Sequence, residues 1–199
     1  MGRPTKFNRD DAIEIAMNTF WSKGYAPTSV SDLATAMSIT RSSFYNSFET
    51  CESVFAEALV RYKNDDIDIH LETRFPGVSA GDSLHFFFNQ VSEKLALDPL
   101  ARGCLIINCF VQASEENPAP PGVYDFIDTK FQQFANRVGE AKAEGELDPT
   151  ADTDTVATSL LTFLIGLNVI GKTIREKHKL KAMAKQFLEN AGFKSPKTD

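Results

Sequence analysis

The segment ITRSSFYNSF, residues 39–48, concentrates hydrogen-bonding side chains on a short stretch of chain. It holds an arginine, a tyrosine, an asparagine and four serine or threonine hydroxyls, and it carries one charge. On a helix of 3.6 residues per turn, four of its side chains share an arc of roughly 140°: Arg41, Ser42, Tyr45 and Asn46. The interleaved aromatic ring of Phe44 points to the opposite side, so the pattern predicts a short helix with one polar and one apolar face.

These residue types suit recognition of duplex DNA. An arginine can bind guanine with two hydrogen bonds, asparagine prefers adenine, and serine accepts either base. Tyrosine and serine also reach phosphate oxygens. Taken alone, the serine and asparagine pattern is more often a solvated surface helix. The DNA interpretation gains support when the neighbouring helices are considered with it.

Two helices precede this segment. Apolar residues at helical spacing predict a first helix over residues 10–23, which Gly24 ends. The stretch TSVSDLATAM predicts a second helix, with Ser29 as N-cap and Asp32 three residues later in a capping-box-like pair. It must end near Ser38, because the next N-cap follows almost at once. The turn of about three residues is typical of a helix-turn-helix.

Thr40 is the N-cap expected for the third helix, which runs to about residue 47, and Thr50 is that of a fourth. Proline and glycine in RFPGVSAGDS then interrupt the pattern. Longer helical segments follow, near residues 81–96, 101–114, 121–143, 152–176 and 180–190. The fold class expected is therefore all-α, with a three-helix helix-turn-helix head on a larger helical body.

The composition fits an ordinary globular protein that stays in the cytoplasm. Of the 199 residues, 42% are apolar and 24% charged, and nothing in MGRPTKFNRDD directs export. The net charge is -6, but the charges of residues 1–63 sum to zero, which leaves room for an anion-binding head. Polar residues interrupt the apolar stretch 156–174, which indicates a buried helix instead of a membrane span. The three cysteines are expected as free thiols.

Residues 2–62 resemble the DNA-binding head of the TetR/AcrR family of repressors. The resemblance is carried by GRPTKF, AIEIAMNTFWSKGYAPTSVSDLATAM, ITRSSFYNSF and ESVFAEALVRY, about a third of the chain. It implies a DNA-binding domain over residues 1–50, a connecting fourth helix over 51–72, and a ligand-binding and dimerisation domain over 73–199. It also implies a cytoplasmic repressor that a small molecule releases from its operator.

The candidate DNA contacts follow from the residues and from the resemblance together. The third helix would contact bases and phosphates, the start of the second would contact phosphates, and the leader would reach the minor groove. The candidates are Arg3, Lys6, Thr28, Ser29, Thr40, Arg41, Ser42, Ser43, Tyr45 and Asn46.

This sequence departs from the family at two positions. The family usually has glycine where Ser38 stands, and a left-handed serine there costs about 1 kcal/mol. The fourth helix usually starts with a lysine that contacts phosphate, and Cys51 stands there instead. The loss of one phosphate contact should flatten the salt dependence of DNA binding by about one unit.

One recognition helix reads few base pairs, so two heads are expected about one DNA turn apart, roughly 34–36 Å. The apolar stretch 156–174, paired with the last helix across a two-fold axis, is the predicted homodimer interface. The alternative is a central helix buried in a monomer. The predicted interface residues are Leu160, Leu164, Leu167, Ile170 and Gly171.

The body is rich in phenylalanine, which predicts a cavity between helices for a small, mainly apolar or aromatic effector, although any single ring is more often plain core. Effector binding would swing the fourth helix and change the spacing of the heads. The predicted lining residues are Phe86, Asn89, Cys104, Asn108, Phe110, Gln112, Phe126, Phe131, Phe163 and Asn168.

Two alternatives remain open. Cys104 lies near a predicted helix start, which stabilises a thiolate, so the chain could sense oxidants or electrophiles; buried inert cysteine is the plainer interpretation. The rival class is a helical carrier or enzyme without DNA binding. The scattered His70, His85 and His178 form no metal motif, and no nucleotide-binding or hydrolase motif occurs. We therefore expect no metal, cofactor or enzymatic activity.

Overall fold

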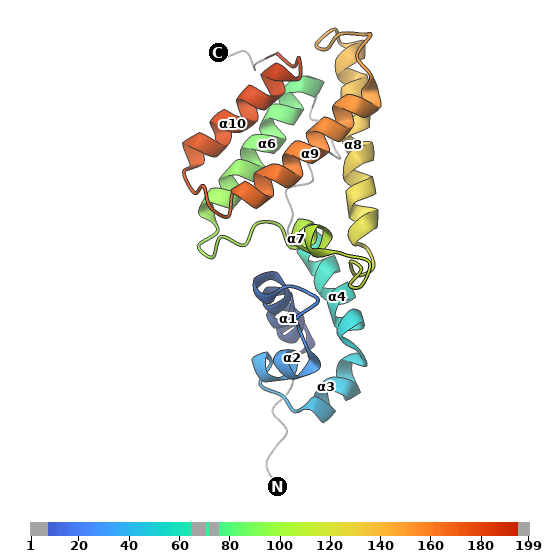
Figure 1. Ribbon diagram of the computed structural model, residues 1–199, viewed down its shortest axis with the longest axis vertical. Helices are drawn as coiled ribbons and strands as arrows, with labels where there is room; N and C mark the ends of the chain where they lie inside the picture. The colour runs from blue at the N-terminus through green and yellow to red at the C-terminus, as the bar shows by residue number, and fades with distance from the viewer. Residues whose placement is uncertain (1–7, 65–70, 72–75, 195–199) are drawn as a thin grey trace. The chain divides into compact units, whose positions relative to one another are not determined.

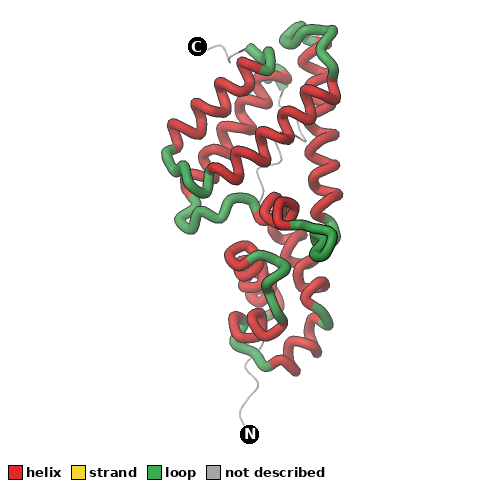
Figure 2. The backbone as a smooth tube through the Cα atoms, viewed as in Figure 1, coloured by secondary structure: helices red, strands yellow, loops and turns green. Residues whose placement is uncertain are grey.

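The computed structural model describes residues 8–64, 71 and 76–194, and within these ranges every regular element is a helix (Figures 1 and 2). This confirms the predicted all-α class. The helices are α1 (Arg9–Lys23), α2 (Val30–Ala36), α3 (Arg41–Phe48), α4 (Cys51–Asn64), α6 (Ala80–Leu97), α7 (Leu105–Gln112), α8 (Val123–Ala143), α9 (Thr153–Ile170) and α10 (Lys177–Asn190).

The chain divides into two compact units. The first comprises Met1–Asp66 together with Cys104–Asp125, and the second comprises Ile67–Gly103 together with Phe126–Asp199. The segment that carries α7 therefore belongs to the same unit as α1–α4. The functional boundaries near residues 50 and 72 stay predictions, because they concern what each part binds.

The core of the first unit is aromatic. The ring of Phe20 on α1 meets that of Phe55 on α4 edge to face, with ring centroids 5.2 Å apart. Tyr25, in the turn after α1, packs against both rings at 5.7 and 4.8 Å. Phe44 and Phe48 of α3 are 0% and 2% exposed. Each buried phenylalanine stabilises the fold by about 1.5–3 kcal/mol relative to an exposed one, so the short α3 is held mainly by its two rings.

The predicted helix caps are present. Ser29 and Asp32 form a reciprocal capping box at the start of α2. The Thr40 hydroxyl accepts from the Ser43 backbone N–H at 3.1 Å, and the Thr50 hydroxyl accepts from the Ser53 backbone N–H at 3.0 Å. Each cap satisfies a backbone donor that has no partner within its helix, which explains why these three helices begin where the sequence predicts.

In the second unit, α6 and α10 pack along each other, and phenylalanines from four helices form a chain of ring contacts. Phe88 of α6 stacks on Phe134 of α8 with centroids 5.9 Å apart. Phe163 of α9 meets Phe88 at 5.3 Å and stacks on Phe187 of α10 at 4.1 Å. Phe88 and Phe134 are both 0% exposed and lie in the core of this unit, while Phe163 and Phe187 are partly exposed at its margin.

Two predicted helix boundaries were wrong. Helix α7 begins at Leu105 and not near residue 101, because Ala101 and Gly103 have positive φ angles of 54° and 72°. A right-handed helix cannot contain such residues. Helix α9 ends at Ile170, and a new helix starts at Lys177 after a six-residue break.

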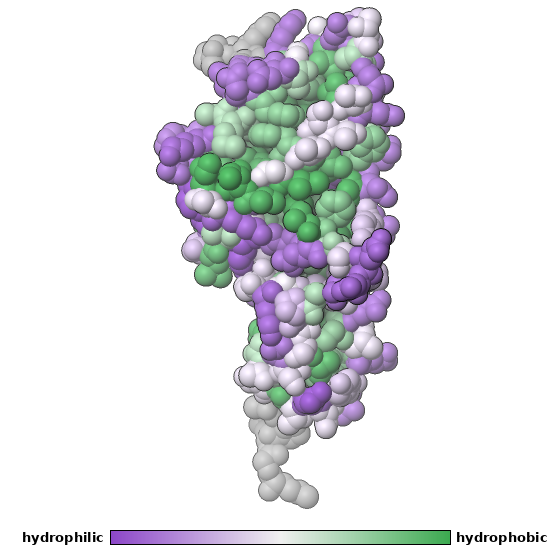
Figure 3. Space-filling model, viewed as in Figure 1, coloured by the Kyte–Doolittle hydropathy of each residue, from purple (hydrophilic) through white to green (hydrophobic). Residues whose placement is uncertain are grey.

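Helix α9 is long and apolar enough to span a membrane by length and composition, a property that core helices of soluble proteins share. Only 28% of it is buried within the chain, so the prediction of a buried helix is wrong for much of its surface. The exposed side includes Val169 and Ile170, which are 45% and 37% exposed. Figure 3 shows apolar surface gathered over the part of the second unit where α9 lies in Figure 1.

The turn between α2 and α3 yields a stability prediction. Ser38 has a φ of 56°, the left-handed conformation that favours glycine. Ser38→Gly should therefore raise the free energy of unfolding by about 1 kcal/mol, measured by chemical denaturation. As a control, Ser22→Gly in helix α1 should lower it, because glycine disfavours a helix. A destabilised Ser38→Gly protein would contradict the strain argument.

Candidate nucleic-acid interface

Helix α3 has the two faces that the sequence predicts. Phe44 and Phe48 are buried on one side. On the other side, Arg41, Ser42 and Asn46 are exposed, and Tyr45 is 49% exposed. An exposed guanidinium, phenol, hydroxyl and amide lie together on an 8-residue helix. Since their backbone is pinned by the two buried rings, these groups form a defined hydrogen-bonding surface.

The N-terminus of α3 adds further polar groups. The hydroxyls of Thr40 and Ser43 lie 2.9 Å apart, and both residues are exposed. Helix N-termini carry partial positive charge and favour anions such as phosphate. The predicted contacts Thr40 and Ser43 therefore lie where a phosphate would be favoured, although Thr40 also caps the helix.

The start of α2 requires one correction. Thr28 is 8% exposed, and its hydroxyl donates to the Gly24 carbonyl oxygen at 2.5 Å. Its side chain is thus occupied in closing the turn after α1 and is not available to a phosphate. Ser29 is exposed, but its hydroxyl donates to the carboxylate of Asp32 in the capping box.

Asp32 connects α2 to α1. Its carboxylate lies 2.6 Å from the Lys23 ammonium. The hydrogen bond from Lys23, followed by those from Ser29, holds the pKa of Asp32 well below its ordinary value. The carboxylate therefore stays ionised across the physiological range, and α2 keeps both its cap and its link to α1.

The remaining predicted contacts divide into two cases. Arg3 and Lys6 lie outside the described residues. Cys51, where the family usually has a lysine, is partly buried at the start of α4. Burial, and then the charge of Asp32, raise the pKa of its thiol, so Cys51 is neutral and supplies no charge to a phosphate.

Sequence reasoning missed the ionic links between α1 and α4. Arg61 pairs with Glu14 at 2.7 Å, and Arg9 pairs with Glu57 at 2.5 Å. The partners are 47 and 48 positions apart. No local pattern could reveal them, because only the packing of α1 against α4 brings these residues together.

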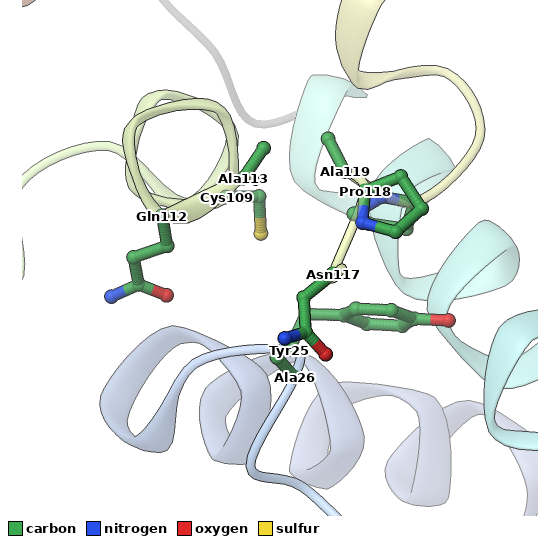
Figure 4. Close-up of a pocket in the computed structure, with 9 residues that line it drawn as sticks. Tyr25, Ala26, Cys109, Gln112, Ala113, Asn117, Pro118 and Ala119 are labelled. Atoms are coloured by element: carbon green, nitrogen blue, oxygen red, sulfur yellow. The ribbon is translucent and has the colours of Figure 1, made fainter. Parts of the chain in front are cut away.

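Four of the predicted effector contacts lie in the first unit. Cys104 is the N-cap residue of α7 and is partly exposed, Asn108 is partly exposed, and the Phe110 ring meets Tyr124 edge-on at 6.1 Å. Gln112 is exposed and lines a small pocket beside Tyr25 (Figure 4). The cavity volume there is about 10 Å³, which is room for about one water molecule, so this pocket cannot hold an effector.

The other six lie in the second unit. Phe126 is buried beneath the Lys130 ammonium, 4.8 Å from the ring centroid, while Asn89 and Phe131 are partly exposed. Phe163 is partly exposed and packs against the rings of Phe88 and Phe187. Two of the predicted effector contacts need correction. Phe86 is 44% exposed, and its ring does not face a cavity between helices. The Asn168 amide donates to the Leu164 carbonyl oxygen of its own helix at 2.9 Å, so this donor is already used.

The residues predicted for the dimer interface also need correction. Leu160, Leu164 and Leu167 are 0%, 4% and 1% exposed, and Gly171 is buried against Leu95. These positions pack inside the chain, because the most apolar stripe of α9 faces its own core. Of the predicted set, only Ile170 lies on the surface.

Within the described ranges, no group of three histidine, cysteine, aspartate or glutamate residues is placed to hold a metal ion.

Comparison with known proteins identifies the head. The profile described as "Bacterial regulatory proteins, tetR family" matches residues 12–58, which include α2, α3 and the turn between them. The chain is 26% identical over 188 residues to the HTH-type transcriptional repressor ComR of Escherichia coli (strain K12), covering 92% of this chain and 88% of ComR. It is 28% identical to the HTH-type transcriptional regulator YezE of Bacillus subtilis (strain 168), covering 90% and 94% of the two chains.

Among solved structures, the TetR family transcriptional regulator CifR, as a cysteine mutant complexed with 26-base-pair operator DNA, superposes with a TM-score of 0.81. The identity is 28%, over 94% of this chain and 98% of that one. Fold and site together define a helix-turn-helix, DNA-binding transcriptional regulator. The profile match over the head, together with relatives that align with most of the chain, supports a transcriptional regulator of the TetR family.

Proposed function

We propose that this protein is a homodimeric, cytoplasmic repressor that binds operator DNA through α3 and that a small effector releases from the DNA. The observation that carries the proposal is the two-sided α3, whose base-reading groups are exposed while Phe44 and Phe48 are buried. The relatives support the direction of regulation, because ComR and DhaR, from Mycobacterium sp. (strain GP1), are both named as repressors. As a regulator of this kind it would have no enzymatic activity.

The DNA-reading role of α3 is tested with a gel shift, using duplex DNA from beside the protein's own gene. Arg41→Ala and Tyr45→Ala should each weaken binding about tenfold or more, because each removes a base or phosphate contact. Phe86→Ala is a matched control, since Phe86 is 44% exposed, close to the 49% of Tyr45, but lies on α6 in the second unit. A carrier or enzyme without DNA binding would give no shift with any version, including the wild type.

The dimer would use the exposed side of α9. This side carries the small or apolar residues Ser159, Thr162, Gly166, Val169 and Ile170, at helical spacing. A Cβ atom added at Gly166 would meet nothing within 4 Å. Small residues let a second helix approach closely, and an apolar face this long is costly to leave in water. These five residues replace the buried leucines as the proposed contact surface.

Gly166→Trp should convert the dimer to a monomer, because the new ring fills the space that the partner helix would occupy. The fold of the single chain should be unaffected, since a Cβ added at Gly166 would meet no other part of that chain within 4 Å. Gly139→Trp is the matched control: Gly139 is also exposed and unobstructed but lies on α8. Sedimentation measures the mass. A dimeric Gly166→Trp protein, or a monomeric wild type, would eliminate this interface.

Effector binding would act on α4 through the segment that carries α7. The Leu105 backbone N–H donates to the Tyr62 hydroxyl of α4 at 3.3 Å. Tyr62 meets Trp21 of α1 edge-on at 5.1 Å. Leu59 of α4 lies against Gly122, where an added Cβ would come within 3.0 Å of it.

A displacement of residues 104–125 would therefore move α4, and α3 with it. The aromatic core of the second unit favours apolar or aromatic effectors.

Thiol chemistry is the second candidate mode of regulation. Cys104 is partly exposed at the N-terminus of α7, where a thiolate is favoured. Cys109 is buried, and this burial raises the pKa of its thiol to about 12, so it is inert at neutral pH. The solved CifR–operator complexes carry cysteine substitutions.

One experiment separates the two modes. Uncharged aromatic compounds and the thiol reagent N-ethylmaleimide are each tested for operator release, on the wild type and on Cys104→Ser. Reversible effector binding predicts release by an aromatic compound in both proteins. Thiol sensing predicts release by the reagent, abolished in Cys104→Ser, with mass spectrometry locating the adduct on Cys104 and not on Cys109. Binding of a compound without any change in operator affinity would remove the effector proposal.

A further inference from the structure

Arg9, the first residue of α1, makes three kinds of contact with two other helices of the DNA-binding head, α3 and α4. Its Nη1 donates to the Ser47 carbonyl oxygen, in the last turn of α3, at 2.6 Å. Its Nε and Nη2 donate to the two carboxylate oxygens of Glu57 on α4, at 3.2 and 2.5 Å. Its guanidinium carbon lies 4.6 Å from the centroid of the Phe48 ring. One side chain thus joins α1, α3 and α4.

We propose that Arg9 is a positioning residue for DNA recognition, which fixes the orientation of α3 without itself binding DNA. The inference rests on the proposed use of α3 to read the operator. A planar guanidinium is suited to this role, because it binds a carboxylate with two parallel hydrogen bonds and stacks on a ring at the same time. A lysine has one charged centre and cannot keep all three contacts.

The C-terminal end of α3 needs contacts from other helices to hold its orientation, because the helix ends abruptly. The helix has 8 residues, and Glu49, its C-terminal flanking residue, has a φ of 62°. The last carbonyl groups of a helix have no partner within it and carry partial negative charge. The Ser53 hydroxyl satisfies the Phe48 carbonyl oxygen, and Arg9 satisfies that of Ser47 while it covers the Phe48 ring. Loss of Arg9 would let this end rotate, which displaces the exposed side chains of α3 from base edges.

The competing explanation is that Arg9 contacts a phosphate directly, since its side chain is 48% exposed. The two explanations predict opposite effects for Glu57→Gln. Removing the negative charge of Glu57 frees Arg9 and makes the surface more positive, so a phosphate contact would become stronger. If Arg9 acts by holding α3, its weaker hydrogen bonds to the neutral amide would instead lower operator affinity.

The experiment compares Arg9→Met, Arg9→Lys and Glu57→Gln of the full chain on its operator and on scrambled duplex DNA, at several salt concentrations. We expect operator affinity to fall about tenfold in Arg9→Met and several-fold in the other two, with affinity for scrambled DNA and the salt slope unchanged. A phosphate contact would instead flatten the slope by about 0.9 per protomer in Arg9→Met, leave Arg9→Lys near wild type, and tighten binding in Glu57→Gln. Any of these three results overturns the proposal.

Arg61→Met is the matched control. Arg61 also pairs α4 with α1, through Glu14 at 2.7 Å, with side chains 40% and 52% exposed, but this ion pair does not involve α3. The thermal stability of the Arg61→Met protein should fall as much as that of the Arg9→Met protein. The operator affinity of Arg61→Met should stay near that of the wild type. Equal losses of affinity in both variants would mean that Arg9 is merely structural. A wild-type protein that binds no DNA would instead refute the proposed function, so the two failures are distinguishable.

Discussion

The burial of Phe44 and Phe48 is the constraint on which the DNA-binding head depends. A helix of 8 residues is too short to be stable alone, so α3 exists because its two rings are 0% and 2% exposed in an aromatic core. The same burial determines which side chains point outward. With the two phenylalanines on the inside, helical geometry leaves Arg41, Tyr45 and Asn46 at the surface.

Around these rings, the head is held by interactions of modest individual strength. The capping box of α2, the Lys23–Asp32 pair and the two arginine–glutamate pairs are all partly exposed, and exposed ion pairs stabilise a fold by about 0–1 kcal/mol each. The value of the ion pairs for this protein is geometric, because each joins two helices. Ser38 also contributes to this geometry. Its left-handed backbone conformation forms the tight turn that sets the crossing of α2 and α3.

In the regulation proposed above, the segment Cys104–Asp125 would be the part that acts on α4. It belongs to the first compact unit although it follows α6 in sequence, and it touches α4 at Tyr62 and Leu59. In the proposed dimer, the exposed side of α9 would join two heads so that they read two half-sites.

The sequence by itself determined the helical class, the starts of α2, α3 and α4, and the outward face of α3. These features depend on local rules: hydroxyl and carboxylate caps act over three residues, and the period of 3.6 assigns side chains to faces. The sequence also carried the family resemblance, since the matching motifs lie in one continuous stretch.

Only the tertiary structure decided what depends on contacts between distant residues. It placed Thr28 in a buried hydrogen bond to Gly24, and it turned the leucines of α9 inward and its small residues outward. It brought Arg9 to Ser47 and Glu57, which are 38 and 48 positions away. An apolar stripe in sequence does not say whether its partner is the same chain or another copy, and a charged residue does not say which helix it meets. Both are settled by packing.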